Sequence, residues 1–184
     1  SKGTLLTGGE TITGNGKYQL NGTYTQGITI NTEGPVEINV TGNVTVDVPK
    51  NDNFITIKKA GSVTFNGDAQ YPVIVNGGNR YFFAFDFSNG INQVENVTIE
   101  SKYGAIRATC NCEKAVIESS IITAKWAYDG AIQCWPREYS SIMELNNLEV
   151  EAEERDALRV EAGTVTVNGG NYKSGQGCAI RTWN

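Results

Sequence analysis

Tryptophan and arginine recur at matched positions in the second half of the chain, together with glutamine and glutamate. Indole rings offer flat apolar faces of the kind that stack on sugar rings, and exposed large aromatic side chains tend to mark binding surfaces. Guanidinium groups bind carboxylates through two parallel hydrogen bonds. These residue types therefore point to ligand binding, and the candidate binding residues are Arg107, Gln133, Trp135, Arg159, Glu161, Arg181 and Trp183.

Catalytic chemistry has fewer candidates in this sequence. Its 184 residues include no histidine, which removes the commonest general base and the commonest transition-metal ligand. Hydrolysis of a glycosidic bond needs two carboxylates that flank the bond, and the arginine-rich positions offer only Asp86 and Glu161, several repeats apart. Arg159 or Arg181 remains a candidate for a lyase reaction. The sequence favours binding over catalysis, and no catalytic residue is assigned.

Metal ligands are equally sparse. Calcium needs several oxygen ligands that converge, and the best candidates near turns are Asp129, Asp156 and Glu153. Glu153 belongs to an acidic run at 149–154, with Lys125 and Lys173 at neighbouring repeat positions. We interpret this run as a solvated ladder of ion pairs in preference to a calcium site. No cofactor is expected, with calcium as the alternative.

An internal repeat positions these side chains. A four-residue phrase with an apolar third residue recurs, and the steps between its third residues, from 106 to 132, 158 and 180, are 26, 26 and 22 residues. Segments 27–30, 54–57 and 83–87 are degenerate copies. A second phrase places a small or amide residue three positions before an apolar one, as at Asn96, Ser119 and Asn147. Each repeat therefore contains at least two short strands separated by turns, and neighbouring repeats must stack to bury their apolar faces.

The predicted fold is all-β, a right-handed parallel β-helix of about 6–7 coils. A β-sandwich also has short strands, but it does not predict one phrase at a nearly constant step. We expect one domain over residues 1–184, with regular coils at 51–184. Residues 1–50 form either the first coils or a cap, because an open solenoid end exposes apolar side chains and unpaired strands.

In a parallel β-helix, equivalent residues of successive coils lie about 4.8 Å apart. The repeat therefore predicts an inward ladder at positions 106, 132, 158 and 180, and a second at 108, 134, 160 and 182. Two outward columns run beside them, one from Asp86 to Arg181 and one from Ser88 to Trp183. The alternative for these columns is a solvated face on which the arginines pair with Asp86 and Glu161, and on which Trp135 packs beneath segment 136–141.

Charge and apolar runs limit the partners. The formal net charge is −5, without a basic tail, which argues against a general nucleic-acid binder. No apolar run approaches the roughly 20 residues that span a bilayer. Asn-X-Thr sequons begin at residues 21, 39, 43 and 96, which agrees with an extracellular location. Among the four cysteines, a bridge between Cys110 and Cys134 is compatible with the register but not required by it.

The rungs at 104–106 and 156–158 resemble the pectate-lyase-like parallel β-helix superfamily. The segments at 16–24 and 27–30 resemble the start of bacterial carbohydrate-binding β-helix domains related to those lyases. This resemblance implies a secreted or cell-surface protein that binds or cuts polysaccharide. We therefore expect an extracellular, non-catalytic polysaccharide-binding β-helix. The alternatives are a structural or adhesive solenoid that self-associates through its ends, and a polysaccharide lyase.

Overall fold

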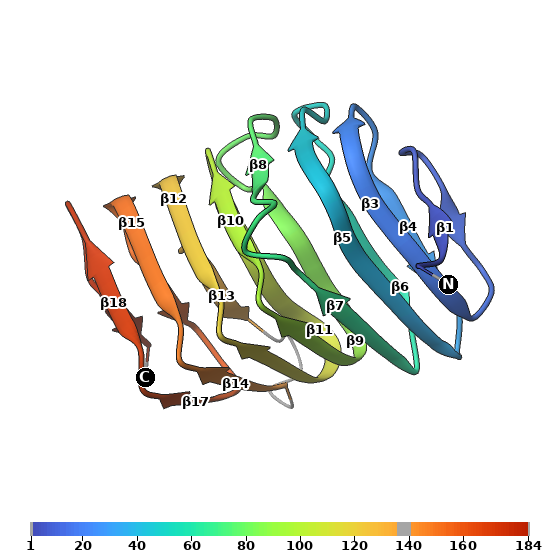
Figure 1. Cartoon of the computed structure of the whole chain (residues 1–184). Helices are drawn as coiled ribbons and strands as arrows, with labels where there is room; N and C mark the ends of the chain where they lie inside the picture. Colours follow the sequence, from blue (N-terminus) through green and yellow to red (C-terminus); the bar gives the residue numbers. More distant parts are fainter. Residues whose placement is uncertain (1, 136–140, 184) are drawn as a thin grey trace.

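The computed structural model describes residues 2–135 and 141–183, with the side chains of Cys110 and Asn111 left undescribed. Within this range the chain is all-β and forms a parallel β-solenoid of about 6 turns, without a helix. Figure 1 shows the coils stacked in sequence order from the N-terminal end, in blue, to the C-terminal end, in red. The all-β parallel solenoid predicted from the repeat is confirmed.

Three parallel faces surround one core. Face 1 contains β2 (Thr11–Ile12), β4 (Ile28–Asn31), β6 (Ile55–Lys59), β13 (Ile132–Trp135), β16 (Leu158–Val160), β19 (Ile180–Thr182) and the first halves of β9 (Phe83–Glu95) and β11 (Gly104–Glu118). Face 2 contains β1 (Thr4–Leu5), β7 (Ser62–Asn66), β14 (Ile142–Asn146), β17 (Thr164–Asn168), the second halves of β9 and β11, and the first parts of β3 (Gly16–Tyr24) and β5 (Pro35–Val46). Face 3 contains the ends of β3 and β5, with β8 (Val73–Val75), β10 (Thr98–Ser101), β12 (Ile121–Ala127), β15 (Glu149–Arg155) and β18 (Asn171–Ser174).

The predicted ladders on face 1 are confirmed by the strand register. Ile106 pairs with Ile132, Ile132 with Leu158, and Leu158 with Ile180. The same column continues toward the N-terminus through Phe85, Ile55 and Ile28, so the degenerate copies also lie in register. Buried aromatic rings pack against one another in the middle coils of the core, where the ring centroids of Phe85 and Phe65 are 4.6 Å apart.

The second repeated phrase forms the corner between faces 2 and 3. Asn96, Ser119 and Asn147 have φ angles of 55°, 49° and 53°, and Gly169 follows in the same column at 64°. This left-handed conformation turns the chain sharply between two strands, and asparagine and glycine adopt it most readily. The stacked turn predicted from these residues is therefore a column of residues that share a left-handed φ.

The first 50 residues contribute coils. The two alternating valine runs form a single strand, β5, which pairs in parallel with β3 on one side and with β7 and β8 on the other. Val36, Ile38, Val44 and Val46 are all buried in the common core. Of the two alternatives for this segment, parallel coils rather than a capping hairpin describe β3 to β5.

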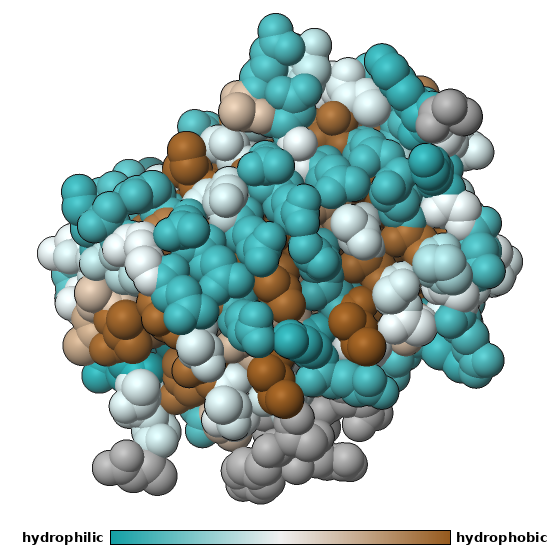
Figure 2. All heavy atoms as spheres, turned by 60° about the horizontal axis from the view of Figure 1, so that its bottom comes forward, coloured by the Kyte–Doolittle hydropathy of each residue, from teal (hydrophilic) through white to brown (hydrophobic). Residues whose placement is uncertain are grey.

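The surface is mainly polar, with single apolar side chains. On the face seen in Figure 2, hydrophilic residues cover most of the surface and hydrophobic residues show between them. In the last described coil, Val167 and Ile180 stand in columns whose earlier members are buried, yet they are 37% and 45% exposed. The described residues contain no apolar helix long enough to cross a membrane.

Candidate functional site

A row of ion-paired side chains follows the outward column of face 1. At its N-terminal end, Arg107 donates from Nε to Oδ1 of Asp86 at 3.1 Å and from Nη2 to Oδ2 at 2.9 Å. Asn53 donates to the same carboxylate at 3.2 Å, and the Arg107 guanidinium lies 5.0 Å from the ring centroid of Phe83. The pair links two neighbouring coils and is held in one geometry from several sides.

Arg159 is the centre of the row. It donates from Nε to Oε1 of Glu161 at 2.8 Å, and its Nη1 lies 3.8 Å from a carboxylate oxygen of Asp129. Nη1 also donates to the backbone carbonyl of Tyr128 at 3.0 Å. Burial raises the pKa of Asp129 above its ordinary value, although the positive charge of Arg159 acts in the opposite direction. Arg159 thus joins two carboxylates from different coils.

Gln133 and Arg181 complete the row. The buried Gln133 side chain donates from Nε2 to Oε2 of Glu161 at 3.1 Å, so Glu161 accepts from two members of the row. Arg181 donates from Nε to Oδ2 of the buried Asp156 at 2.7 Å. Asp156 also accepts from the backbone N–H of Cys178 at 2.9 Å. Arg107 and Arg159 thus pair with Asp86 and Glu161, as the ion-paired alternative for this face expected, whereas Arg181 pairs with Asp156, which that alternative did not include.

Exposed tryptophan rings accompany the row. Trp183 is 45% exposed, and the guanidinium groups of Arg159 and Arg181 lie 4.4 Å and 5.9 Å from its ring centroid. Trp135, which pairs with Thr109 in the next outward column, is 41% exposed. Segment 136–140, which the sequence offered as a cover for Trp135, lies outside the described residues. The structure thus brings the seven predicted residues onto one outward surface of face 1.

A cluster of tyrosine and arginine at the corner between faces 3 and 1 was not predicted. Tyr81, which is 50% exposed, meets Tyr128 edge to face at 5.5 Å between centroids. The Arg80 guanidinium lies 4.7 Å and 4.9 Å from these two rings, and that of Arg155 lies 5.0 Å from Tyr128. The available signal was positional, because Tyr128-Asp129 directly precedes a copy of the first repeated phrase and Arg80-Tyr81 precedes another copy by one residue.

Shallow hollows follow the same edge of face 1. Asp86 lines a hollow of about 430 Å³, Arg107 lines one of about 320 Å³, and Arg159 lines one of about 350 Å³. The second hollow includes Tyr81, and the third includes Trp183. Because these three residues belong to one column, the hollows form a discontinuous groove parallel to the solenoid axis. We call this surface, with its row of ion pairs and its flanking aromatic rings, the face 1 groove.

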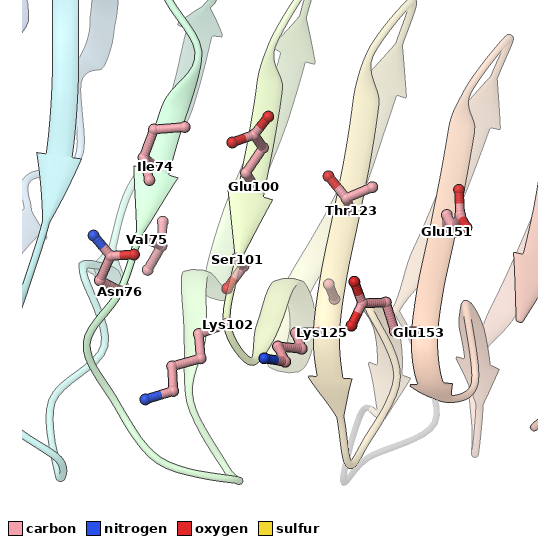
Figure 3. A pocket seen from close by; sticks show the side chains of 11 residues that line it. Ile74, Val75, Asn76, Glu100, Ser101, Lys102, Thr123, Lys125, Glu151 and Glu153 are labelled. Atoms are coloured by element: carbon pink, nitrogen blue, oxygen red, sulfur yellow. The ribbon is translucent and has the colours of Figure 1, made fainter. Parts of the chain in front are cut away.

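A larger hollow of about 560 Å³ lies on face 3, across β8, β10, β12 and β15 (Figure 3). Its lining includes Glu100, Glu151, Glu153, Lys102 and Lys125. Both lysines approach the Trp126 ring, with their Nζ atoms 5.3 Å and 4.7 Å from its centroid. Within the described residues, no ion pair joins Lys125 or Lys173 to the acidic run. The acidic run is solvated, as predicted, and Glu151 is the register partner of Lys173, but the ion pairs of the predicted ladder are not formed among the described residues.

The three candidate metal ligands have different surroundings. Asp129 faces Arg159, Asp156 binds Arg181, and Glu153 lines the hollow on face 3. Among the residues that the structure describes, no group of three or more acidic or cysteine side chains has an arrangement suited to a metal ion. Cys112 and Cys134 are buried free thiols, so Cys134 does not form the bridge to Cys110 that the register allowed.

Comparisons of this chain with protein-family models, with curated proteins and with solved structures found no match. The parallel β-solenoid is therefore established by the structure alone. The likeness of its rungs to the pectate-lyase-like superfamily stays a resemblance of pattern, and the face 1 groove must be interpreted from its own chemistry.

Proposed function

We propose that this chain binds an extended polysaccharide along the face 1 groove. The observation that carries the proposal is the combination of exposed aromatic rings with planar hydrogen-bonding groups on one side of the solenoid. Trp183 and Tyr81 present flat apolar surface, and the paired guanidinium and carboxylate groups between them present donors and acceptors. Sugar rings have the same two features, an apolar ring surface and a rim of hydroxyl groups.

The dimensions of the groove suit a chain-like ligand. Strand spacing of about 4.8 Å places Asp86 and Arg181, four coils apart in one column, about 19 Å from each other. A parallel solenoid repeats its side chains at each step, so several sugar units of a polymer meet similar groups. A compact ligand would instead need an enclosed pocket, because most small-molecule sites are clefts or cavities that bury the ligand.

Binding is favoured over cleavage because of how the carboxylates are engaged. Each of the acids in the row contacts an arginine, and Asp129 and Glu161 share the same one. General acid–base catalysis requires a carboxyl group that is within reach of the scissile bond and available to transfer a proton. The lyase alternative has no specific observation in its favour.

The proposal places the protein outside the cell or on its surface, as the resemblance of the rungs implies. Exposed sequons at Asn21, Asn43 and Asn96 agree with that location. Asn39, in contrast, is hydrogen-bonded within face 2, where it donates to Glu37 at 3.1 Å and accepts from Asn66 at 3.0 Å. The accessible sequons lie near the corner between faces 2 and 3, so glycans attached there leave the groove on face 1 open.

A glycan array followed by affinity electrophoresis tests the proposal. The wild type should bind at least one polysaccharide, and Trp183→Ala and Tyr81→Ala should each weaken that binding about tenfold, as loss of an interfacial aromatic anchor usually does. Trp126→Ala, which removes an aromatic side chain from face 3, is the matched control and should bind like the wild type. Failure to bind any glycan, or equal binding by all four proteins, would contradict the proposal.

A second candidate function is assembly through the solenoid end. It is favoured by Val167 and Ile180, whose column neighbours in earlier coils are buried while they themselves are exposed. Stacking of a second copy on the last described coil would cover these two side chains. Light scattering should then show oligomers that grow with protein concentration and disappear in Ile180→Asp. A wild-type monomer at every concentration would count against this candidate.

A further inference from the structure

Most of the arginines and carboxylates of the face 1 groove are paired with one another. Three arginines in the row contact four carboxylates, so the row by itself carries one negative charge more than positive. The pairs are Arg107 with Asp86, Arg159 with Glu161 and Asp129, and Arg181 with Asp156. A surface that recognises a polyanion normally offers unpaired cations instead.

Three cations border the row without a carboxylate partner in the described part of the chain. Lys50 lines the hollow of Arg107 together with Asp52, and Arg155 lines the hollow of Arg159. The guanidinium groups of Arg80 and Arg155 lie against the ring of Tyr128. Arg80 is also close enough to Asp129 to act against the rise in the pKa of that carboxyl. Its charge therefore offsets the excess negative charge of the row.

Paired guanidinium and carboxylate groups still have hydrogen-bonding capacity. A guanidinium has five N–H donors, and Arg107 uses two of them on Asp86, while each carboxylate has about four acceptor positions. A sugar hydroxyl both donates and accepts, so neighbouring hydroxyls can bridge such a pair without separating it. A ligand carboxylate or sulfate only accepts, so it could use the remaining N–H donors of the arginines but none of the acceptor positions of Asp86 or Glu161. It would also lie beside a resident carboxylate of the same charge in a partly buried site, which opposes its binding.

We infer that the ligand of the face 1 groove is a neutral, hydroxyl-rich glycan chain, and not a uronic-acid or sulfated one. This inference rests on the proposed polysaccharide-binding function and specifies its ligand class. The ion pairs act as a pre-formed array of donors and acceptors that matches vicinal hydroxyl groups. The aromatic rings of Trp183 and Tyr81 supply the apolar contact at the borders of that array.

Affinity electrophoresis with three classes of polymer, each at low and at high NaCl, tests the inference. The probes are neutral chains (xylan, glucomannan and mixed-linkage β-glucan), a uronan (polygalacturonate) and a sulfated chain (dextran sulfate). The wild type should bind a neutral chain, with an affinity that changes less than about twofold with salt, because no net charge is neutralised on binding. Retardation by polygalacturonate or dextran sulfate alone, lost at high salt, would overturn the inference while preserving the proposed function. Absence of binding to all probes would overturn the proposed function itself.

Two sets of variants separate the ion-paired row from the marginal arginines. Glu161→Gln keeps the size of the side chain and removes its charge, and it should weaken binding of the neutral chain about tenfold or more. The double variant Arg80→Gln with Arg155→Gln should bind that chain within about twofold of the wild type. The reverse pattern, with the double variant inactive and Glu161→Gln unaffected, would overturn the inference. Far-ultraviolet circular dichroism establishes whether each variant is folded. If Glu161→Gln does not fold, Gln133→Glu, which adds a negative charge beside Glu161, replaces it as the variant of the row.

Discussion

Arg107 and Asp86 lie on neighbouring coils of face 1 and are joined by two hydrogen bonds of 3.1 Å and 2.9 Å. Their side chains are mostly buried, although both belong to the outward column of the sheet. Parallel strand pairing places them at matching positions, and it leaves a planar guanidinium opposite a planar carboxylate. The pair therefore contributes to the cohesion of the coils as well as to the proposed groove.

Removal of one partner should destabilise the solenoid. In Asp86→Asn the carboxylate charge is lost and Arg107 keeps a poorly compensated charge in a largely buried position, so unfolding should become about 2–3 kcal/mol easier. Urea denaturation followed by circular dichroism measures this change. Glu33→Gln is the control, because its ion pair with Lys59 has side chains that are 79% and 55% exposed. The control should unfold like the wild type, and an equal loss in both variants would contradict the structural role of the buried pair.

The inward ladder on face 1 predicts that the stability lost on truncating an isoleucine depends on the position of its coil in the stack. Ile106 and Ile180 belong to one column, but Ile106 is fully buried and Ile180 is exposed in the last described coil. Ile106→Ala should reduce the free energy of unfolding by about 2–5 kcal/mol, because it leaves a cavity. Ile180→Ala should change it by less than about 1 kcal/mol. Denaturation curves of the two variants check the difference, and equal losses would mean that the end of the stack is covered in solution.

The ladder was predictable because the first repeated phrase begins directly after a turn in each coil. Face 2 was not identified as a separate face, because β9 and β11 each run from face 1 to face 2 as one strand. Gly90 turns β9 at this corner with φ 71°, but its partner in β11 is Cys112, so no recurring turn residue marks the corner in the sequence. The partners of Arg159 were only half predictable. Glu161 follows from the outward columns, whereas Asp129 comes from the insertion between Ala127 and Ile132, which has no equivalent in the next coil. Column alignment cannot assign a contact to an inserted residue.

At the corner between faces 2 and 3, introducing a glycine and removing one should have opposite effects on the stability of the fold. Ser119 has φ 49°, a conformation that costs an L-residue about 1–2 kcal/mol, so Ser119→Gly should stabilise the fold by about 0.5–1 kcal/mol after the entropy of glycine is counted. Gly169 has φ 64° in the same column, and Gly169→Ala should destabilise it by about 1 kcal/mol. Thermal denaturation compares the two variants. Asn147→Gly is the control and should have a smaller effect, since asparagine tolerates this conformation. A destabilised Ser119→Gly would show that the backbone strain at this corner has been overestimated.

The cysteines give a prediction that depends on both burial and pKa. Burial raises the pKa of Cys134 to about 12 and that of Cys112 to about 11. Only the thiolate reacts with alkylating agents, and at pH 8 these two groups are almost entirely thiols. In the folded protein, iodoacetamide should therefore label the half-buried Cys178 much faster than Cys112 or Cys134.

Peptide mass spectrometry after timed labelling measures each rate. Raising the pH from 7 to 9 should leave Cys112 and Cys134 largely unlabelled in the folded protein, because both pH values lie below their raised pKa values and the core excludes the reagent. In urea Cys112, Cys134 and Cys178 should react at similar rates, since unfolding restores ordinary pKa values and access together. Rapid labelling of Cys134 in the folded protein would contradict the inward register of β13, and with it the outward positions of Gln133 and Trp135 on which the face 1 groove depends.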